Sequence, residues 1–410
     1  ANLDLLAAYE RALRLGTPIN AISSLISAPD RALEGPLHGV AIAVKDIIDI
    51  KGQPRGNGNP IDMAGPAATS DAPVITRLRE LGADVFATTT LLEYAAGATH
   101  PGVPEAMNPY NPKLTAGGSS GGSAAIVGAG VCDVAIGTDT GGSIRIPAHY
   151  CGVVGFKPSY NSISLDGVTP LSPTFDHVGI LAKDVATTIK VFSNIVPTLK
   201  PAASTNLKGL RVGIIPSQYD LPELEKDVKA SIQNVIDQLK KNGAEIVELD
   251  GNVYVELEKT FGDILLFEAW QVHREKITKD PEHYGYETRR LLQSAESATK
   301  DAYEKALARR AELLKVAEQV HEQVDVLLSP SCPYVSPETT PPIDTAMGMA
   351  EGAYTALANI TGEPSISIPS GLDSNGLPIG VQLKSKIHTD MQLLSIAQAV
   401  EALGLFTPAF

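Results

Sequence analysis

Short apolar runs alternate with amphipathic stretches along the first part of the chain. Residues 40–44 are five consecutive apolar residues, which is typical of a strand buried on both faces. Residues 72–82 predict a helix with Asp71 as its N-cap, and residues 84–88 predict the next strand. Alternation of this kind favours the α/β class, with a large mixed central sheet covered by helices on both faces.

The same patterns continue to the end of the chain. Small residues at 123–130 predict a closely packed central helix, and residues 133–137 predict a core strand. Two long stretches with charged outer faces, 254–277 and 288–323, predict helices that form a cap over the sheet. Further strands are expected at 209–215, 244–250, 324–328, 365–368 and 379–383. Further helices are expected at 185–196, 224–242 and 391–403. Asp184 is the expected N-cap of the first of these helices, and Asp390 is the expected N-cap of the last.

Composition narrows the class of protein. The chain has 410 residues, of which 43% are hydrophobic, and its net charge is −14. This negative charge argues against nucleic acid as a partner. No apolar run reaches the roughly 18 residues that a transmembrane helix needs, and residues 1–16 predict an amphipathic helix rather than a signal peptide. The three cysteines have no CxxC spacing, which indicates reduced thiols in a cytoplasmic protein.

Two clusters of glycine and serine lie in the middle of the sequence, at 117–123 and 141–143. Glycine permits close backbone approach and unusual backbone angles, so backbone N–H groups and hydroxyls can converge on one point. Acyl transfer needs this combination of a nucleophilic oxygen and fixed donors for the developing oxyanion. Two successive glycines make the segment from Thr140 through Gly141 and Gly142 to Ser143 the natural oxyanion hole.

Other chemistries fit these clusters less well. A phosphate-binding loop requires a lysine after the glycines, and none is present. The segment 118–122 matches the G-x-S-x-G nucleophile elbow with Ser120 as nucleophile, but an elbow follows a strand and residues 108–113 are rich in turn formers. A purely structural role in tight turns would explain one cluster of glycines, but it does not explain two clusters in this arrangement. The eight histidines show no HxxxH or HxH pattern, so we expect no zinc and no other cofactor.

The two clusters resemble the amidase signature family, whose hallmark is a GGSS cluster followed by G-x-(D/Q)-x-GGS-(I/V)-R-x-P. Here GGSSGG begins at Gly117, the second motif occupies 137–147, and Ser119 and Ser143 are 24 residues apart, as in the family. Residues 39–46, 151–158 and 176–179 also match. The resemblance implies a single domain with its motifs at 35–195, a variable, largely helical cap region at about 205–325, and a return to the core at 325–410.

The resemblance implies a role for three side chains: Ser143 is the nucleophile, Ser119 bridges it to the base after a cis peptide bond, and Lys45 is the base. A free lysine titrates near ~10.4, so its pKa has to fall by about three units for it to accept a proton at neutral pH. Burial can do this, and strand alternation directs Asp46 to the opposite face. We expect Asp139 and Arg145 to form a structural ion pair. The expected substrate-binding residues are Gly117, Gly118, Leu92, Tyr94, Ala95, Asp176 and His177, the last two in a loop near the substrate.

These observations favour an amidohydrolase that cleaves the C–N bond of a small amide through an acyl-enzyme on Ser143. Two alternatives keep the same three side chains. One is a carbamate or ester hydrolase, and the other is the amidase subunit of a glutamyl-tRNA(Gln) amidotransferase. The expected partner is a small-molecule amide, with no nucleic acid and no membrane, and the expected state is a monomer or homodimer.

Overall fold

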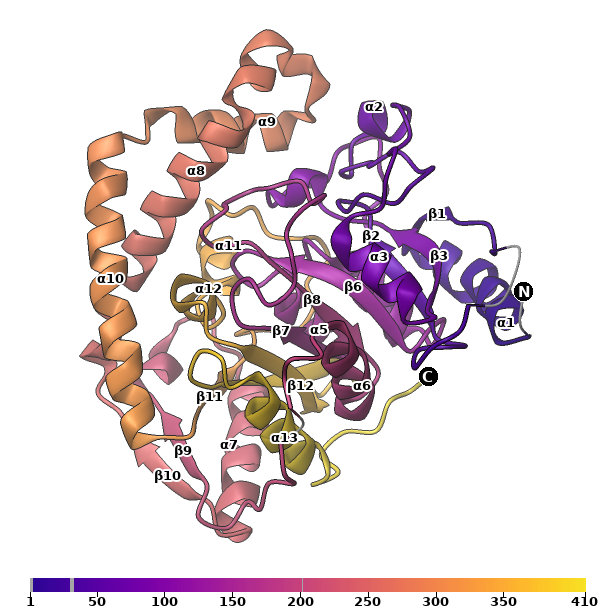
Figure 1. Cartoon of the computed structure of the whole chain (residues 1–410). Coiled ribbons are helices and arrows are strands. Elements are labelled where there is room, and N and C mark those ends of the chain that lie inside the picture. The colour runs from indigo at the N-terminus through magenta and orange to yellow at the C-terminus, as the bar shows by residue number, and fades with distance from the viewer. Residues whose placement is uncertain (1–2, 30–32, 201) are drawn as a thin grey trace.

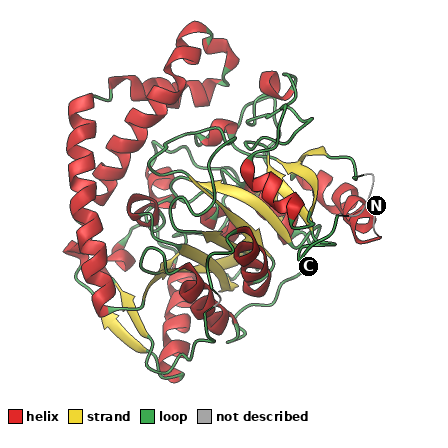
Figure 2. Cartoon of the chain, viewed as in Figure 1, coloured by secondary structure: helices red, strands yellow, loops and turns green. Residues whose placement is uncertain are grey.

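The computed structural model describes residues 3–29, 33–200 and 202–410 and shows an α/β fold around one twisted sheet (Figures 1 and 2). Eleven strands form this mixed sheet, as the sequence predicts for the class. In spatial order the strands are β1 (Ile22–Leu25), β3 (Asp84–Thr89), β2 (Ala41–Lys45), β6 (Val134–Asp139), β8 (His177–Ala182), β7 (Val154–Lys157), β12 (Ser365–Leu372), β13 (Pro378–Lys384), β11 (Val326–Pro330), β9 (Arg211–Ile214) and β10 (Glu245–Glu248). A separate hairpin pairs β4 (Met107–Asn108) with β5 (Asn111–Thr115).

The strands predicted at 40–44 and 133–137 are present at the centre of the sheet as β2 and β6. β2 pairs in parallel with β6, and Ala43 lies opposite Ala135. Side chains alternate across β2, so that Ile42 and Val44 enter one buried apolar cluster and Ala43 enters another. The sheet is therefore covered on both faces.

Helices supply these two apolar layers. One layer contains residues of α3 (Pro73–Glu80), α6 (Val185–Ile195), α7 (Lys226–Lys241) and α13 (Asp390–Glu401). The other contains residues of α1 (Leu3–Arg11), α4 (Gly121–Gly128) and α5 (Arg145–Cys151). The short helices are α2 (Pro60–Met63), α11 (Ala346–Glu351) and α12 (Ala356–Thr361).

Residues 257–323 form a helical flank at the left of Figure 1, made of α8 (Leu257–Lys279), α9 (Tyr286–Ser294) and α10 (Lys300–Gln323). The helical stretch that the sequence predicts over 288–323 is divided in the structure, because Thr299 caps a new helix by accepting from Ala302 N at 3.1 Å. The assignment of residues of about 205–325 to a variable cap region stays a prediction. Among the described residues, no helix combines the length and apolar character needed to cross a membrane.

Two of the three predicted N-caps are wrong. Asp184 does cap α6, accepting from Thr187 N at 2.8 Å. Asp71 instead accepts from Lys51 N and Arg79, and α3 begins after Ala72. Asp390 lies inside the first turn of α13, where its carboxylate holds Ser159. In both cases the carboxylate accepts hydrogen bonds from a residue far away in the sequence and does not cap the helix.

The cap of α6 gives a test of stability. Replacing Asp184 with Ala leaves the Thr187 N–H without its side-chain acceptor, so we expect the free energy of unfolding to fall by about 1 kcal/mol. Urea denaturation followed by circular dichroism measures the change. The neighbouring Asp133→Ala is the control: its ion pair with Lys183 is exposed to solvent and its loss costs less than about 0.5 kcal/mol. Equal losses in the two variants would contradict the assignment of the cap.

Candidate active site

β2 delivers a lysine amine to the interior of the protein. Lys45 is the last residue of the strand and its side chain is fully buried. Its Nζ lies 2.7 Å from Ser119 Oγ and 2.6 Å from Thr138 Oγ1 on the neighbouring strand β6. The contact with Ser119 is the one that the sequence predicts. Thr138 was not foreseen, because it precedes the second glycine cluster and its hydroxyl carries no motif of its own.

Burial lowers the pKa of Lys45 to about 7, although the carboxylates of Asp139 and Asp176 act in the opposite direction. Asp46 takes no part in this balance. Its carboxylate accepts from Ser23 Oγ at 3.0 Å and from Gly56 N at 3.2 Å, so it lies apart from the amine, as strand alternation predicts. The lysine can therefore be neutral at physiological pH.

Ser119 enters this site from a tightly packed loop. The peptide bond between Gly118 and Ser119 is cis, as the family resemblance implies. Leu92 lies against Gly118, where a Cβ atom would come within 2.3 Å of Leu92 Cδ1. The backbone N–H of Leu92 also donates to Ser119 O at 3.2 Å. Leu92 thus packs directly on the loop that holds Ser119.

Ser120 has a different role from its neighbour. It is fully buried, its hydroxyl donates to Thr138 O at 2.9 Å, and it accepts from Thr138 N at 3.2 Å. Its own N–H donates to Ser143 O at 3.1 Å. With its hydroxyl engaged by the β6 backbone, Ser120 joins the two glycine clusters and does not fit a nucleophile elbow.

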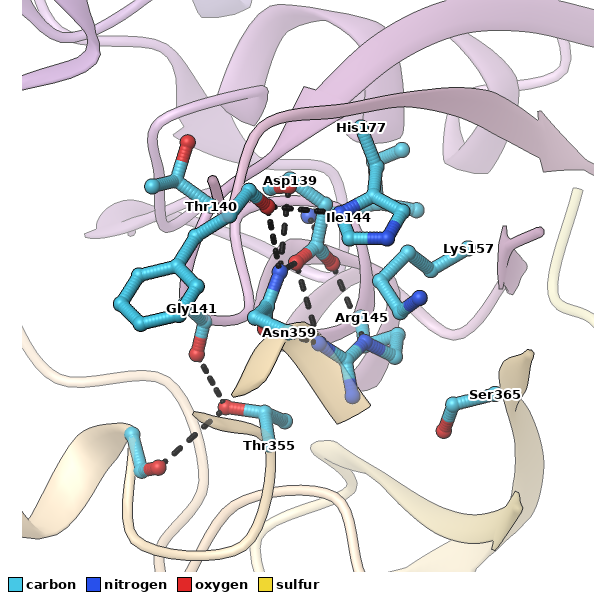
Figure 3. A network of polar contacts seen from close by, with 12 residues as sticks. Asp139, Thr140, Gly141, Ile144, Arg145, Lys157, His177, Thr355, Asn359 and Ser365 are labelled. Atoms are coloured by element: carbon cyan, nitrogen blue, oxygen red, sulfur yellow. Dashed lines mark hydrogen bonds and ion pairs between the residues drawn. The ribbon is translucent and has the colours of Figure 1, made fainter. Parts of the chain in front are cut away.

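Hydrogen bonds with Asp176 and Thr355 hold the segment 140–143, and Figure 3 shows the contact between Thr355 and Gly141. Thr140 Oγ1 donates to Asp176 at 2.6 Å, and Thr355 Oγ1 donates to Gly141 O at 2.6 Å. Gly142 has a φ of 141° and no room for a side chain, since a Cβ atom would lie 2.3 Å from Thr355 Oγ1. Ser143 follows and stays partly exposed. The arrangement fixes the backbone around a partly exposed serine.

Behind this segment lies the ion pair that the sequence predicts. Arg145 donates two hydrogen bonds of 3.0 Å to the carboxylate of Asp139, and both side chains are fully buried. Arg145 holds the pKa of Asp139 far below its usual range. Asn359 bridges the pair, accepting from Arg145 at 2.8 Å and donating to Asp139 (Figure 3). Gln382 also accepts from Arg145, at 2.7 Å.

Sequence reasoning missed Thr355, Asn359 and Gln382. The only signal was the return to the core at 325–410 that the resemblance implies, which gave these side chains no role. Within residues 3–29, 33–200 and 202–410, no three His, Cys, Asp or Glu side chains are arranged to hold a metal ion.

The remaining candidate substrate residues fall into two groups. Gly117 lies in the loop with Gly118, and its Cα is covered by the ring of Tyr150. Tyr94 instead turns toward the end of α8: its hydroxyl bonds to Asp62, His283 and Lys276. Ala95 follows it with a φ of 57°. Tyr94 therefore ties the core to the helical flank.

Asp176 and His177 are buried close to the segment 140–143. The carboxylate of Asp176 accepts from Thr140 and from the N–H groups of Leu171 and Ser172, while burial raises its pKa to about 6. His177 was expected in a loop and instead begins β8, where it pairs with Asp139 across the sheet. Its Nδ1 contacts Phe175 O at 2.6 Å, and burial holds its pKa well below the usual value, so the ring is neutral.

Known proteins share both the sequence and the fold. The model of the Amidase family matches residues 19–394. An amidase from Pseudomonas putida is 33% identical over 366 residues, which cover 84% of this chain and 77% of that protein. A glutamyl-tRNA(Gln) amidotransferase subunit from Lachnospira eligens is 32% identical, with 90% and 85% covered. A crystal structure of an amidase superposes with a TM-score of 0.87 at 29% identity, covering 98% of this chain and 95% of that one. The chain therefore belongs to the amidase signature family of amide hydrolases.

Proposed function

We propose that this chain hydrolyses the C–N bond of a small amide through an acyl-enzyme on Ser143. The observation that carries the proposal is the buried Lys45 amine, 2.7 Å from Ser119 Oγ, with its pKa lowered to about 7. A neutral amine has one lone pair and two N–H donors. It can accept the Ser119 proton while donating to Thr138 Oγ1, so Thr138 orients the lone pair toward Ser119.

The reaction follows from this arrangement. Lys45 takes the proton of Ser119 as Ser119 takes that of Ser143, and Ser143 Oγ bonds to the carbonyl carbon. Backbone N–H groups of the segment 140–143 stabilise the oxyanion. On collapse of the tetrahedral intermediate, the C–N bond breaks and the leaving amine receives a proton back from Lys45 through Ser119. A water molecule then attacks the ester, and the same relay removes its proton. When the bond to Ser143 Oγ breaks, the relay returns this proton to Ser143 and the carboxylic acid leaves.

Relatives named as amidotransferase subunits favour a second candidate function. Seven curated relatives at 30–32% identity carry that name. In that role the same side chains would release ammonia from glutamine for a partner protein. Glutamine hydrolysis that requires a copurifying subunit would support this candidate. Hydrolysis of simple amides by the isolated chain would support the first, and a panel of amides, carbamates and esters ranks the substrates.

Replacing Ser143 tests the nucleophile. We expect Ser143→Ala to lower kcat by several orders of magnitude, as loss of a serine nucleophile does in other hydrolases, while circular dichroism and the melting temperature stay unchanged. Mass spectrometry of the wild type after reaction with a sulfonyl fluoride should place the label on Ser143. A label on Ser120 would contradict the proposal and restore the nucleophile elbow.

Replacing Lys45 tests the base. Because its pKa is lowered to about 7, activity should rise with pH through about 7, as the ammonium loses its proton, and remain high in the alkaline range. Lys45→Ala should abolish this rise and lower the acylation rate by about 10²- to 10⁴-fold. Amides should suffer more than esters, because an amine leaving group needs a proton and an alkoxide needs it less.

The control for this experiment is Lys51→Ala, which removes an exposed lysine six residues away. It should keep the wild-type pH profile of kcat/KM. A Lys45→Ala enzyme with near-wild-type amide hydrolysis and an unchanged profile would refute the assignment of the base.

A further inference from the structure

Helix α8 brings an aromatic ring against the oxyanion segment. A Cβ atom at Gly141 would lie 2.7 Å from Phe261 Cζ, so the ring edge meets the backbone there. Gly141 precedes Ser143 by two residues, and two peptide steps span at most about 7.6 Å between Cα atoms. Phe261 therefore lies within reach of a group attached to a carbonyl that Ser143 attacks.

The ring has a fixed orientation. Phe261 stacks on Phe175 with ring centroids 5.2 Å apart and an angle of 16° between the planes. Phe175 is fully buried, and its carbonyl oxygen accepts from Asn359 at 3.3 Å. Phe261 itself stays partly exposed, as Ser143 does. Of the two stacked rings, Phe261 is the one that a substrate can contact.

The helix that carries this ring is fixed to the loop at 171–176. Glu268 of α8 accepts from Ser172 Oγ at 2.8 Å and from Thr174 N at 2.9 Å. The same loop provides Asp176, which holds Thr140. Because α8 and the oxyanion segment are attached to one loop, the distance between Phe261 and Ser143 is set by the fold.

The surroundings of the ring are apolar. Phe261 packs with Ile264, Leu257 and Leu265 in a cluster that also contains Phe175. The nearby carboxylate of Asp263 is paired with Arg309 on α10 at 2.8 Å. A ring in such a cluster offers contact area and dispersion, and it offers no hydrogen-bond donor to an anionic group.

We propose that Phe261 is a specificity-determining residue that selects amides with an apolar group, aryl or branched alkyl, beside the scissile bond. The inference rests on the proposed role of Ser143. A substrate with only a methyl group there leaves the ring uncovered, whereas a larger apolar group buries it. Adding or removing one methylene group of a substrate in an apolar pocket changes kcat/KM by about 10-fold or more. The preference for a larger apolar group is therefore large enough to measure.

The test compares two serine-directed reagents, phenylmethanesulfonyl fluoride and methanesulfonyl fluoride. With each reagent Ser143 Oγ bonds to sulfur, fluoride leaves, and the hydroxyl proton passes to solvent. The second-order labelling rate is followed by mass spectrometry and requires no known substrate. The ratio of the two rates reports the preference for the aryl group.

Three variants make the comparison specific. In Phe261→Ala the ratio should fall by about 5- to 20-fold, and in Phe261→Leu by about 2- to 5-fold, because an apolar side chain remains. Phe267→Ala is the matched control: Phe267 is on the same helix but stacks on Tyr303 of α10, with ring centroids 4.2 Å apart. There the ratio should stay within about twofold of the wild type.

Each outcome decides a different claim. Labelling of Ser143 with a ratio that neither Phe261 variant changes would overturn the role of Phe261 alone. If Phe261→Ala does not fold, the ratio in Phe261→Leu decides the matter. Absence of label on wild-type Ser143 with both reagents would refute the proposed nucleophile, and with it this inference.

Discussion

Removal of the Lys45 amine from water is the constraint on which the rest of the site depends. A buried ammonium is costly without a counter-ion, and this cost is what brings the lysine pKa to about 7. Two carboxylates, Asp139 and Asp176, act against it. Arg145 takes up the charge of Asp139 with two hydrogen bonds, and Thr140 and backbone N–H groups satisfy Asp176. Desolvation therefore exceeds attraction, and the ion pair behind the segment 140–143 contributes to the lowered pKa that the proposed base needs.

The glycines meet a second requirement, which is that side chains from distant segments pack directly on the backbone of the two clusters. Leu92 can lie on the Ser119 loop because Gly118 has no side chain, and Thr355 can hold Gly141 O because Gly142 has none. Substitution at either glycine would force apart segments that are distant in sequence. The serine positions are thus consequences of packing, and the two clusters contain far more glycine than a single turn would need.

The parts of the site that the sequence predicted are those encoded by local pattern. The apolar run before Lys45 gives β2, residues 133–137 give β6, and their parallel pairing places Lys45 beside Thr138. The contact of Lys45 with Ser119 follows from the family resemblance. The parts that it did not predict depend on long-range contacts. Asp390 resembles a helix cap and holds Ser159, and Asn359 bridges Asp139 to Arg145 across 220 and 214 residues of chain. A residue whose partner is that far away carries no local signature.

The helical flank is coupled to the catalytic segment through one continuous set of contacts. Tyr303 of α10 donates to Glu268 of α8 at 2.6 Å, and Glu268 holds the loop whose Asp176 binds Thr140. The base and the serines, in contrast, belong to the sheet and to the loops at its strand ends. In the proposed mechanism the fold therefore separates two tasks: the sheet fixes the proton relay, while the flank positions the surface that faces the substrate. Glu268 connects α8 to the loop at 171–176. A substitution that shifts α8 therefore moves both Phe261 and the loop that holds Thr140. In the proposed mechanism, a substitution in the flank that changes specificity also changes the geometry of the segment 140–143.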